Sequence, residues 1–334
     1  MRRLFLILFV TSLLAGTVAH SQTVTNLTDK QKYELAAEYS RSHNGVAVLV
    51  MKGDKIVFED YSTDDAEEMP WFLASGTKSF SGVMCAAAIE DKLIKSFDEK
   101  VSDTITEWKS DPRKSKITIR QLLSLTSGID AGQIGIVPTY AEAITSRASY
   151  EPGTHFEYGP VPFQVFGELM TRKLKPKNET VMSYLKRRIL DPIGLSVAFW
   201  RKKNDQLLLP QGVSLTAREW AKFGVLLKNN GKWNGKQIVD GKLLDELTVG
   251  SKVNPAYGLT FWLNAKGTGP SGNERMNVGG EVLNGGKPLD FFMAAGAGNQ
   301  RLYVIRTQDL VVVRFGMFGG WDDREFISKL LTGK

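Results

Sequence analysis

Residues 71–89 of this chain read WFLASGTKSFSGVMCAAAI, an apolar run that encloses a small polar island containing Ser75 and Lys78. If the run is helical from about Ser75 to Lys95, residues three apart lie on one face, so the Lys78 ammonium can reach the Ser75 hydroxyl. Apolar neighbours would keep water from the lysine, and desolvation lowers the pKa of an amine. Ser75 would also lie at a helix N-terminus, where free N–H groups favour negative charge. The stretch therefore supplies a nucleophile and its activating base.

The same Ser-x-x-Lys spacing occurs a second time, at Ser183 and Lys186. That copy lies in a predicted amphipathic helix over 179–190 whose cations face water, and an exposed lysine keeps its proton. Spacing alone is therefore weak evidence, and the apolar surroundings single out Ser75 and Lys78. The alternative for this pair is a buried helix of small residues with a lysine whose ammonium extends to the surface.

The N-terminus has the pattern of a targeting segment. A basic start, Met1 to Arg3, precedes an apolar run, Leu4 to Gly16, and small residues lead up to Ser21. This order predicts a signal peptide over 1–21, with cleavage near Ser21 and a periplasmic or secreted mature protein. The apolar run is too short to span a bilayer and no later run is long enough, so no integral membrane segment is expected after signal removal.

Cysteine, charge and histidine exclude several functions. The single cysteine, Cys85, lies inside the predicted helix, which argues against a lipid anchor at the cleavage site and against an internal disulfide. The formal net charge of +7 comes from dispersed cations without interleaved aromatics, so no nucleic-acid partner is expected. Only His43 and His155 remain after signal removal, and no His-x-x-x-His or Cys-x-x-Cys occurs, so we expect neither a metal nor another cofactor. Because Gly-x-Ser-x-Gly is also absent, a serine enzyme here would use a base other than histidine.

Strand-like runs lie near both chain ends and helical patterns lie between them. Gly45–Lys52 and Lys55–Tyr61 flank a Gly-Asp turn and predict a β-hairpin. Further strands are predicted over 257–263, 289–295, 301–305 and 310–315, and helices over 28–42, 117–128, 163–174, 214–230 and 322–331. This order predicts one sheet built from both termini with an inserted helical lobe. We place the sheet lobe at about 22–70 and 250–334, and the helical lobe at about 75–245.

Tyr158 is the third candidate for chemistry. It follows a predicted turn over 151–154 and precedes a helix, which would place it at the edge of a lobe, facing a cleft. The pKa of a phenol is about 10, and an adjacent ammonium lowers it by favouring the anion. Tyr158 and Lys78 could then pass one proton from Ser75 to a leaving group. The alternative is a tyrosine with a structural role alone.

Four motifs follow one another in a recognisable order. They are Ser75-x-x-Lys78, ITIRQLL with TSG over 117–128, PGTHFEY over 152–158, and FGVLL with GKWNGK over 223–236. This order resembles the serine β-lactamase-related superfamily, which includes class C β-lactamases, DD-peptidases, family VIII esterases and 6-aminohexanoate-dimer hydrolases. The resemblance covers nearly the whole of 22–334. It implies an α/β fold of the α+β type, β-lactamase/transpeptidase-like, with an antiparallel sheet flanked by helices. It also implies an acyl-enzyme on Ser75, activation by Lys78, and Tyr158 as acid and base.

Relatives in this superfamily carry Lys-Thr-Gly or His-Thr-Gly on a strand that lines the cleft, followed by a backbone N–H of the oxyanion hole. The matching strand end here reads FMAAGAGNQ over 292–300. The resemblance aligns Ala294, Ala295 and Gly296 with the triplet as substrate-cleft residues. It gives the oxyanion hole to the N–H groups of Ala297 and Ser75. An alignment shifted onto 298–300 remains open.

Two departures from the family pattern affect the expected substrate. Ala294 cannot hold a substrate carboxylate as the lysine or histidine of relatives would, although Arg301 could substitute. Pro160 stands where relatives have a polar residue such as Asn, and it lacks both an amide side chain and a backbone donor. The sequence therefore predicts an exported serine hydrolase for a small-molecule or peptide-like ester or amide. The alternatives are a β-lactamase or DD-peptidase acting on cell-wall peptides, and a non-catalytic binding or sensor domain of the same fold.

Overall fold

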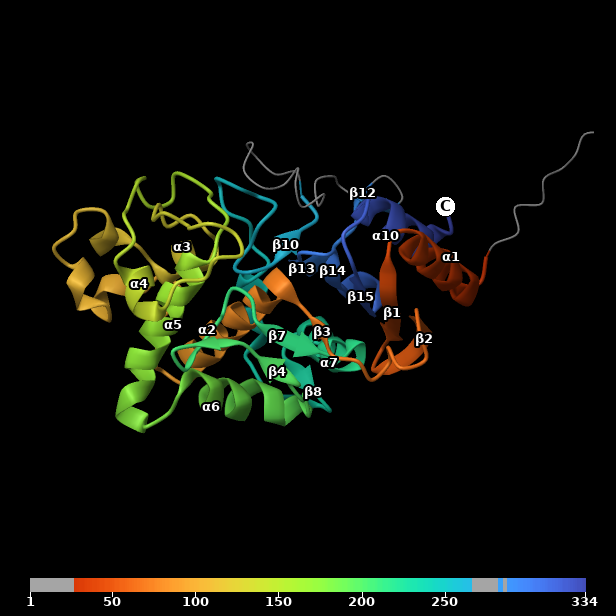
Figure 1. Ribbon diagram of the computed structural model, residues 1–334, viewed down its shortest axis with the longest axis horizontal. Coiled ribbons are helices and arrows are strands. Elements are labelled where there is room, and N and C mark those ends of the chain that lie inside the picture. Colours follow the sequence, from red (N-terminus) through yellow and green to blue (C-terminus); the bar gives the residue numbers. More distant parts are fainter. Residues whose placement is uncertain (1–26, 266–281, 285–286) are drawn as a thin grey trace, which may run out of the picture.

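The computed structural model describes residues 27–265, 282–284 and 287–334, so the predicted signal peptide over 1–21 lies outside the described residues (Figure 1). A six-stranded antiparallel sheet in the order β10-β13-β14-β15-β1-β2 forms the framework. Its strands are β1 (Gly45–Lys52), β2 (Lys55–Tyr61), β10 (Trp262–Leu263), β13 (Phe292–Gly296), β14 (Gln300–Ile305) and β15 (Leu310–Gly316). Because β1 pairs with both β2 and β15, the sheet is built from both chain ends, as predicted. The division into lobes stays a prediction.

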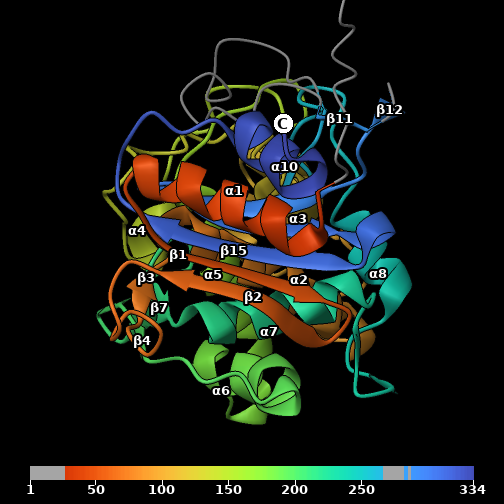
Figure 2. The ribbon, with the colours of Figure 1, turned by 90° about the vertical axis from the view of Figure 1, so that its right-hand side faces the viewer.

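Helices cover both faces of this sheet. On one face α1 (Asp29–Ser42) packs against α10 (Asp323–Thr332), and Figure 2 shows both beside β1 and β15. On the other face lies α7 (Ala217–Lys228), where Gly224 touches Val311 and Leu302. With both faces covered, every residue of β15 is buried, which explains the apolar run from Leu310 to Val313.

Side-chain caps fix where these helices begin. Thr28 and Gln31 form a capping box ahead of α1, which satisfies two backbone N–H groups at once. Thr216 caps α7 and accepts from the Glu219 N–H, whereas Ser214 belongs to a strand. Asp322 caps α10. The predicted helix starts near 28, 214 and 322 are thus confirmed to within a few residues.

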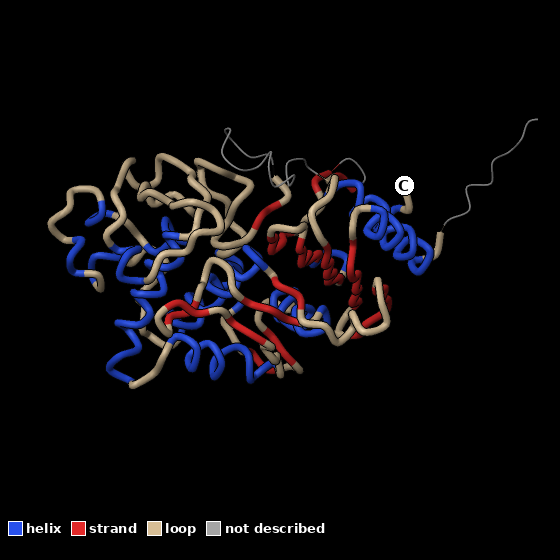
Figure 3. Tube along the Cα trace, viewed as in Figure 1, coloured by secondary structure: helices blue, strands red, loops and turns tan. Residues whose placement is uncertain are grey.

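Helices are the main regular structure of the segment between β2 and β10, and long loops connect them (Figure 3). Besides α7, its α-helices are α2 (Ser79–Glu90), α3 (Ile119–Leu123), α4 (Tyr140–Ile144), α5 (Val161–Leu174), α6 (Val181–Leu185) and α8 (Gly241–Glu246). Short helical turns lie between these helices. One is a π-helical turn, η6 (Lys186–Leu190), and the others are the 3-10 turns η1 (Ala74–Lys78), η2 (Val101–Asp103), η3 (Thr106–Trp108), η4 (Lys114–Lys116), η5 (Lys175–Lys177) and η7 (Asp191–Ile193). A further 3-10 turn, η8 (Arg306–Gln308), links β14 to β15. Short strands complete it: β3 (Trp71–Phe72), β7 (Val213–Leu215) and β4 (Phe199–Trp200) form one small sheet. Two hairpins lie in the same segment: β5 (Lys202–Lys203) with β6 (Gln206–Leu207), and β8 (Lys232–Trp233) with β9 (Lys236–Gln237). After β10, β11 (Leu283–Asn284) pairs antiparallel with β12 (Lys287–Pro288).

Three predicted elements are shorter than expected, and left-handed residues lie at the breaks. The helix expected to reach Lys95 ends at Glu90, and Lys92 has φ +59°. The helix expected over 117–128 ends at Leu123, just before Leu125 with φ +60°. The strand expected over 257–263 is reduced to β10 because Thr260 has φ +83°, which no extended strand allows.

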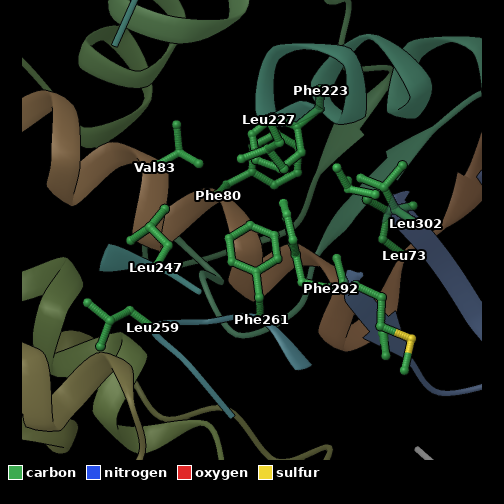
Figure 4. Packing of buried hydrophobic residues seen from close by; sticks show 14 of the residues in the cluster. Leu73, Phe80, Val83, Phe223, Leu227, Leu247, Leu259, Phe261, Phe292 and Leu302 are labelled. Carbon is green, nitrogen blue, oxygen red and sulfur yellow. The ribbon is translucent and has the colours of Figure 1, made fainter. Parts of the chain in front are cut away.

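The core is organised around α2, which is apolar on all sides. Its residues from Ser79 to Ala88 are buried, including the free thiol of Cys85. Figure 4 shows Phe80 of α2 beside Phe223 of α7, with Phe261, which precedes β10, and Phe292 of β13 in the same cluster. The helix is thus locked between the sheet and the helical segment, and so is the turn η1 that precedes it.

Within the described ranges, no helix is both long and apolar enough to cross a membrane.

Candidate active site

Ser75 lies where strand β3 turns abruptly into η1. The Leu73 N–H donates to the Val213 carbonyl (2.9 Å), and the next residue, Ala74, has φ +47°. A left-handed conformation costs a non-glycine residue about 1–2 kcal/mol, so surrounding packing must hold it. The turn places Ser75 at the N-terminal end of η1 and α2, partly exposed, and its N–H has no acceptor in the part of the chain that the structure describes.

Lys78 is buried directly beside this serine. Its Nζ donates to Ser75 Oγ (3.0 Å) and to the Pro210 carbonyl (2.9 Å), and only 4% of the residue is exposed. Nζ also lies 4.8 Å from the ring centroid of Tyr158 and 5.4 Å from that of Phe163. Because these contacts include no carboxylate, burial lowers the Lys78 pKa from 10.5 to about 7. A large fraction is therefore neutral amine near pH 7, able to accept the Ser75 proton.

Tyr158 reaches the pair from the loop before α5. The Glu157 N–H donates to the Leu125 carbonyl (3.0 Å), and Gly159 fits tightly because a Cβ there would lie 2.1 Å from the Ala131 carbonyl oxygen. The phenol ring stacks on Trp262 of β10 with centroids 5.6 Å apart. The loop is thus pinned on one side by the helical segment and on the other by the sheet. The structure brings Ser75, Lys78 and Tyr158 together.

The titration of Tyr158 differs from the expectation. Burial raises its pKa from 10.0 to about 12, and side-chain hydrogen bonding with Ser75 and Trp262 offsets this only in part. The expected lowering of the Tyr158 pKa by an adjacent ammonium is wrong, because burial raises it and also lowers the Lys78 pKa to about 7, which weakens the neighbouring charge. Near neutral pH, Tyr158 is therefore a protonated phenol, and Lys78 has the lower pKa of the two.

The substrate-cleft residues assigned by alignment lie at the end of β13. Ala294, Ala295 and Gly296 are buried, and Ala297 is exposed in the turn before β14. A Cβ on Gly296 would lie 2.0 Å from the Leu73 carbonyl oxygen, so the strand end packs directly on the segment that carries Ser75. Side chains alternate along a strand, so Ala294 shares the face of Gly296 and Ala295 points to the opposite face.

Arg301 does not replace the missing cation of the triplet. Its guanidinium donates to both carboxylate oxygens of Asp323 (2.8 and 3.2 Å), and only 2% of the residue is exposed. The suggestion that Arg301 could hold a substrate carboxylate is therefore wrong. Pro160 also offers no donor, and it serves as the residue from which α5 begins.

Sequence reasoning missed the Pro210 carbonyl that binds Lys78. A backbone acceptor leaves no signature in residue type, and its position depends on a contact across the fold. Gln164 of α5 provides this contact, since its side chain donates to the Pro138 carbonyl (2.8 Å) and accepts from the Leu209 N–H (3.1 Å). A buried glutamine within an apolar helix was the only available signal.

The other serine–lysine pair and the two histidines do not contact Ser75 or Lys78 in the part of the chain that the structure describes. Thr180 caps α6 by accepting from the Ser183 N–H, so Ser183 belongs to a capping box. Lys186 is exposed and pairs with Asp191 (3.4 Å). The described side-chain contacts of His43 are to Ser42, Tyr39 and Trp321. His155 stacks on Tyr150, so neither histidine contacts Ser75 among the described residues. Among the residues described, no three His, Cys, Asp or Glu side chains are grouped to hold a metal ion.

The pKa of Lys78 predicts how acylation depends on pH. The amine is the reactive form, so the acylation rate is expected to fall about tenfold per pH unit below about 7 and to level off above it. No decline is expected up to pH 9.5, because the Tyr158 pKa is about 12. Stopped-flow acylation by a p-nitrophenyl ester from pH 5 to 9.5 measures this profile. A rate independent of pH between 5 and 8 would contradict Lys78 as the base.

The contact between β13 and the Ser75 segment predicts the effect of a single methyl group. Gly296→Ala is expected to lower the free energy of unfolding by about 1–3 kcal/mol, because the added Cβ meets a backbone oxygen that cannot move alone. Acylation should also slow. Gly320→Ala is the matched control, since no atom lies within 4 Å of its Cβ position. Urea unfolding compares the two variants, and equal stabilities would refute the contact.

Several proteins of known structure are similar to this chain in fold. A search of curated proteins finds no match. Among solved structures, a candidate 6-aminohexanoate-dimer hydrolase from Bacillus anthracis is 18% identical with a TM-score of 0.68, covering 88% of this chain and 79% of its own. A class C β-lactamase from Rhodobacter sphaeroides is 16% identical with a TM-score of 0.66, covering 91% and 98%. EstCE1, a hydrolase with promiscuous acyltransferase activity, is 14% identical with a TM-score of 0.65, covering 90% and 98%.

These three likenesses show the fold, which is the expected β-lactamase/transpeptidase-like fold with helices around an antiparallel sheet. The family itself is shown by sequence. The model of the family described as Beta-lactamase matches residues 21–317, a range that includes every candidate site residue named above. The chain therefore belongs to the Beta-lactamase family.

Proposed function

We propose that this chain is an exported serine hydrolase that cleaves an ester or amide through an acyl-enzyme on Ser75. The observation that carries the proposal is the buried contact between Lys78 Nζ and Ser75 Oγ (3.0 Å), with the Lys78 pKa lowered to about 7. A lysine that only supported the fold would gain from an acidic partner, and its described contacts include none. Family membership supports hydrolase activity in general.

The reaction begins when the Lys78 amine takes the proton from Ser75. The Ser75 oxygen attacks the substrate carbonyl, and the N–H groups of Ser75 and Ala297 receive the oxyanion, each contributing roughly 3 kcal/mol when preorganised. Tyr158 gives its phenol proton to the leaving group and regains one from the Lys78 ammonium. Water then attacks the acyl-enzyme with these roles reversed.

The proposed substrate is an ester or amide that carries no carboxylate next to the bond that is cleaved. Ala294 presents a methyl group where a carboxylate would need a cation, and the Arg301 guanidinium is occupied by Asp323. The branch of esterases and 6-aminohexanoate-dimer hydrolases fits this site best. A non-catalytic binding domain fits less well, because binding alone does not require a buried lysine beside a serine.

The second candidate is a β-lactamase or DD-peptidase acting on cell-wall peptides. The family match and the class C structural neighbour favour it. The absence of a cation at Ala294 argues against efficient recognition of a penicillin carboxylate.

One protein sample tests the proposal against this candidate. The sample is treated with a fluorophosphonate and with a panel of p-nitrophenyl esters, D-amino-acid amides and β-lactams. The proposal expects a fluorophosphonate adduct on the peptide that contains Ser75 and turnover of the esters. Nitrocefin turnover or a penicillin adduct on Ser75, without ester turnover, would favour the second candidate. A stable acyl adduct without any turnover would favour a binding domain.

Export has its own test. The pattern over 1–21 supports it, and we expect the mature N-terminus to lie near Ser21. Mass spectrometry of the protein recovered from the periplasm or medium measures that terminus. Recovery only as the full-length chain in the cytoplasm would contradict export.

A further inference from the structure

The turn that follows Gly296 is held by buried side chains. Each of the five carbonyls from Gly296 to Gln300 accepts a hydrogen bond from at least one of three side chains. Arg301 donates to the carbonyls of 296 and 300, Gln300 to those of 297 and 298, and Arg314 to those of 298 and 299, at 3.0–3.3 Å. These side chains are 0–3% exposed. A turn that only connected two strands would not need this many buried side-chain donors.

These contacts set the direction of the N–H groups. A trans peptide is planar, so the Ala297 N–H points opposite to the Gly296 carbonyl and therefore away from Arg301. Arg301 extends toward α10, while the Leu73–Gly76 segment packs on the other face of Gly296. The Ala297 N–H is thus directed toward the segment that carries Ser75. No acceptor for the N–H groups of residues 297–299 occurs in the ranges that the structure describes.

Arg301 is itself anchored. Asp323, the first residue of α10, accepts from the Arg301 Nε (2.8 Å), from the Trp321 indole (3.1 Å) and from the Tyr303 hydroxyl. Asp323 is 2% exposed, so this carboxylate is fully engaged inside the protein. A guanidinium held at two N–H groups has few alternative orientations, which fixes the group that binds the Gly296 carbonyl.

We propose that Arg301, anchored by Asp323, is a positioning residue that aims the Ala297 N–H at the oxyanion formed on a Ser75-bound substrate. This inference rests on the proposed function, since it assumes that Ser75 forms an acyl-enzyme. The pair touches no substrate, and it acts through the Gly296–Ala297 peptide. A misdirected donor weakens binding of the tetrahedral state while the bound substrate is held as before.

The test compares Arg301→Met with Arg188→Met. Arg188 is also largely buried and pairs with Asp91 and Glu90, but these acids lie at the C-terminal end of α2, whereas Ser75 precedes its N-terminus. For Arg301→Met we expect kcat for the best ester to fall about 10²-fold with KM within about threefold, as for a displaced catalytic group. The inhibition constant of an arylboronic acid, which forms a tetrahedral adduct with a serine, should weaken by a similar factor. Arg188→Met should change neither quantity by more than about threefold, even where it lowers the unfolding temperature.

Asp323→Asn is the second variant, which decides the question if Arg301→Met does not fold. It leaves Arg301 in place without its charged anchor, and kcat and boronic acid affinity should fall together by about tenfold. The inference is overturned if a folded Arg301→Met or Asp323→Asn keeps both within threefold of the parent, or if its losses match those of Arg188→Met. A Ser75→Ala variant assayed alongside separates the two proposals. Parental hydrolysis by Ser75→Ala overturns the proposed function, whereas a Ser75-dependent enzyme that is indifferent to Arg301 overturns only this inference.

Discussion

Replacing Ser75 by alanine is expected to lower kcat for the best ester by at least about 10³-fold, because it removes the only atom that can form the proposed acyl-enzyme. The substitution removes one oxygen from a partly exposed position, so the fold should be retained. Intact-mass spectrometry after fluorophosphonate treatment should show no adduct on the variant. Steady-state turnover of p-nitrophenyl esters measures the loss in rate.

The chain provides its own control for this substitution. Ser183 has the same spacing to a lysine, but it lies on the surface at the start of α6. Ser183→Ala should therefore keep parental turnover and the full adduct mass. Undiminished labelling of Ser75→Ala would show that the nucleophile lies elsewhere.

Replacing Lys78 by methionine is expected to lower the acylation rate by about 10²–10⁴-fold, because the proton of Ser75 loses its acceptor. The pH profile should change as well. In the parent the rate rises toward pH 7, and in Lys78→Met this rise should disappear. Stopped-flow acylation measures both effects, and a rate within tenfold of the parent would remove Lys78 from the mechanism.

Stability distinguishes this loss of activity from misfolding. The Lys78 pKa is lowered on folding, so between about 7 and 10.5 the unfolded chain binds this proton more tightly than the folded chain. The parent therefore loses stability as pH falls through this window, and methionine avoids that loss. Lys78→Met should unfold in urea at pH 6 at no lower concentration than the parent, while Lys186→Met should leave activity unchanged.

Local spacing was enough to predict the pairing of Ser75 with Lys78. The two residues are three apart on one turn, and their burial follows from the apolar letters around them. Tyr158 required a long-range contact, which only the order of several motifs could suggest. The direction of its pKa shift could not be predicted from sequence, because it depends on whether the neighbouring lysine keeps its charge in the folded protein.

The role of Arg301 also lay beyond local reasoning. A cation one strand away from Ala294 looks available for substrate until its partner is known, and that partner, Asp323, belongs to the last helix. The early ends of three predicted helices and strands have a similar cause. Lys92, Leu125 and Thr260 take left-handed conformations that their residue types do not favour, so tertiary packing rather than local propensity ends these elements.

The pairing of β1 with β15 has a consequence for synthesis. The first strand of the sheet ends at Lys52, but it finds one of its two neighbours only when residues 310–316 have left the ribosome. Until then β1 presents an open edge, and contacts this distant along the chain form slowly. Nascent chains of this protein should therefore need a chaperone or rapid translocation to avoid strand-mediated aggregation.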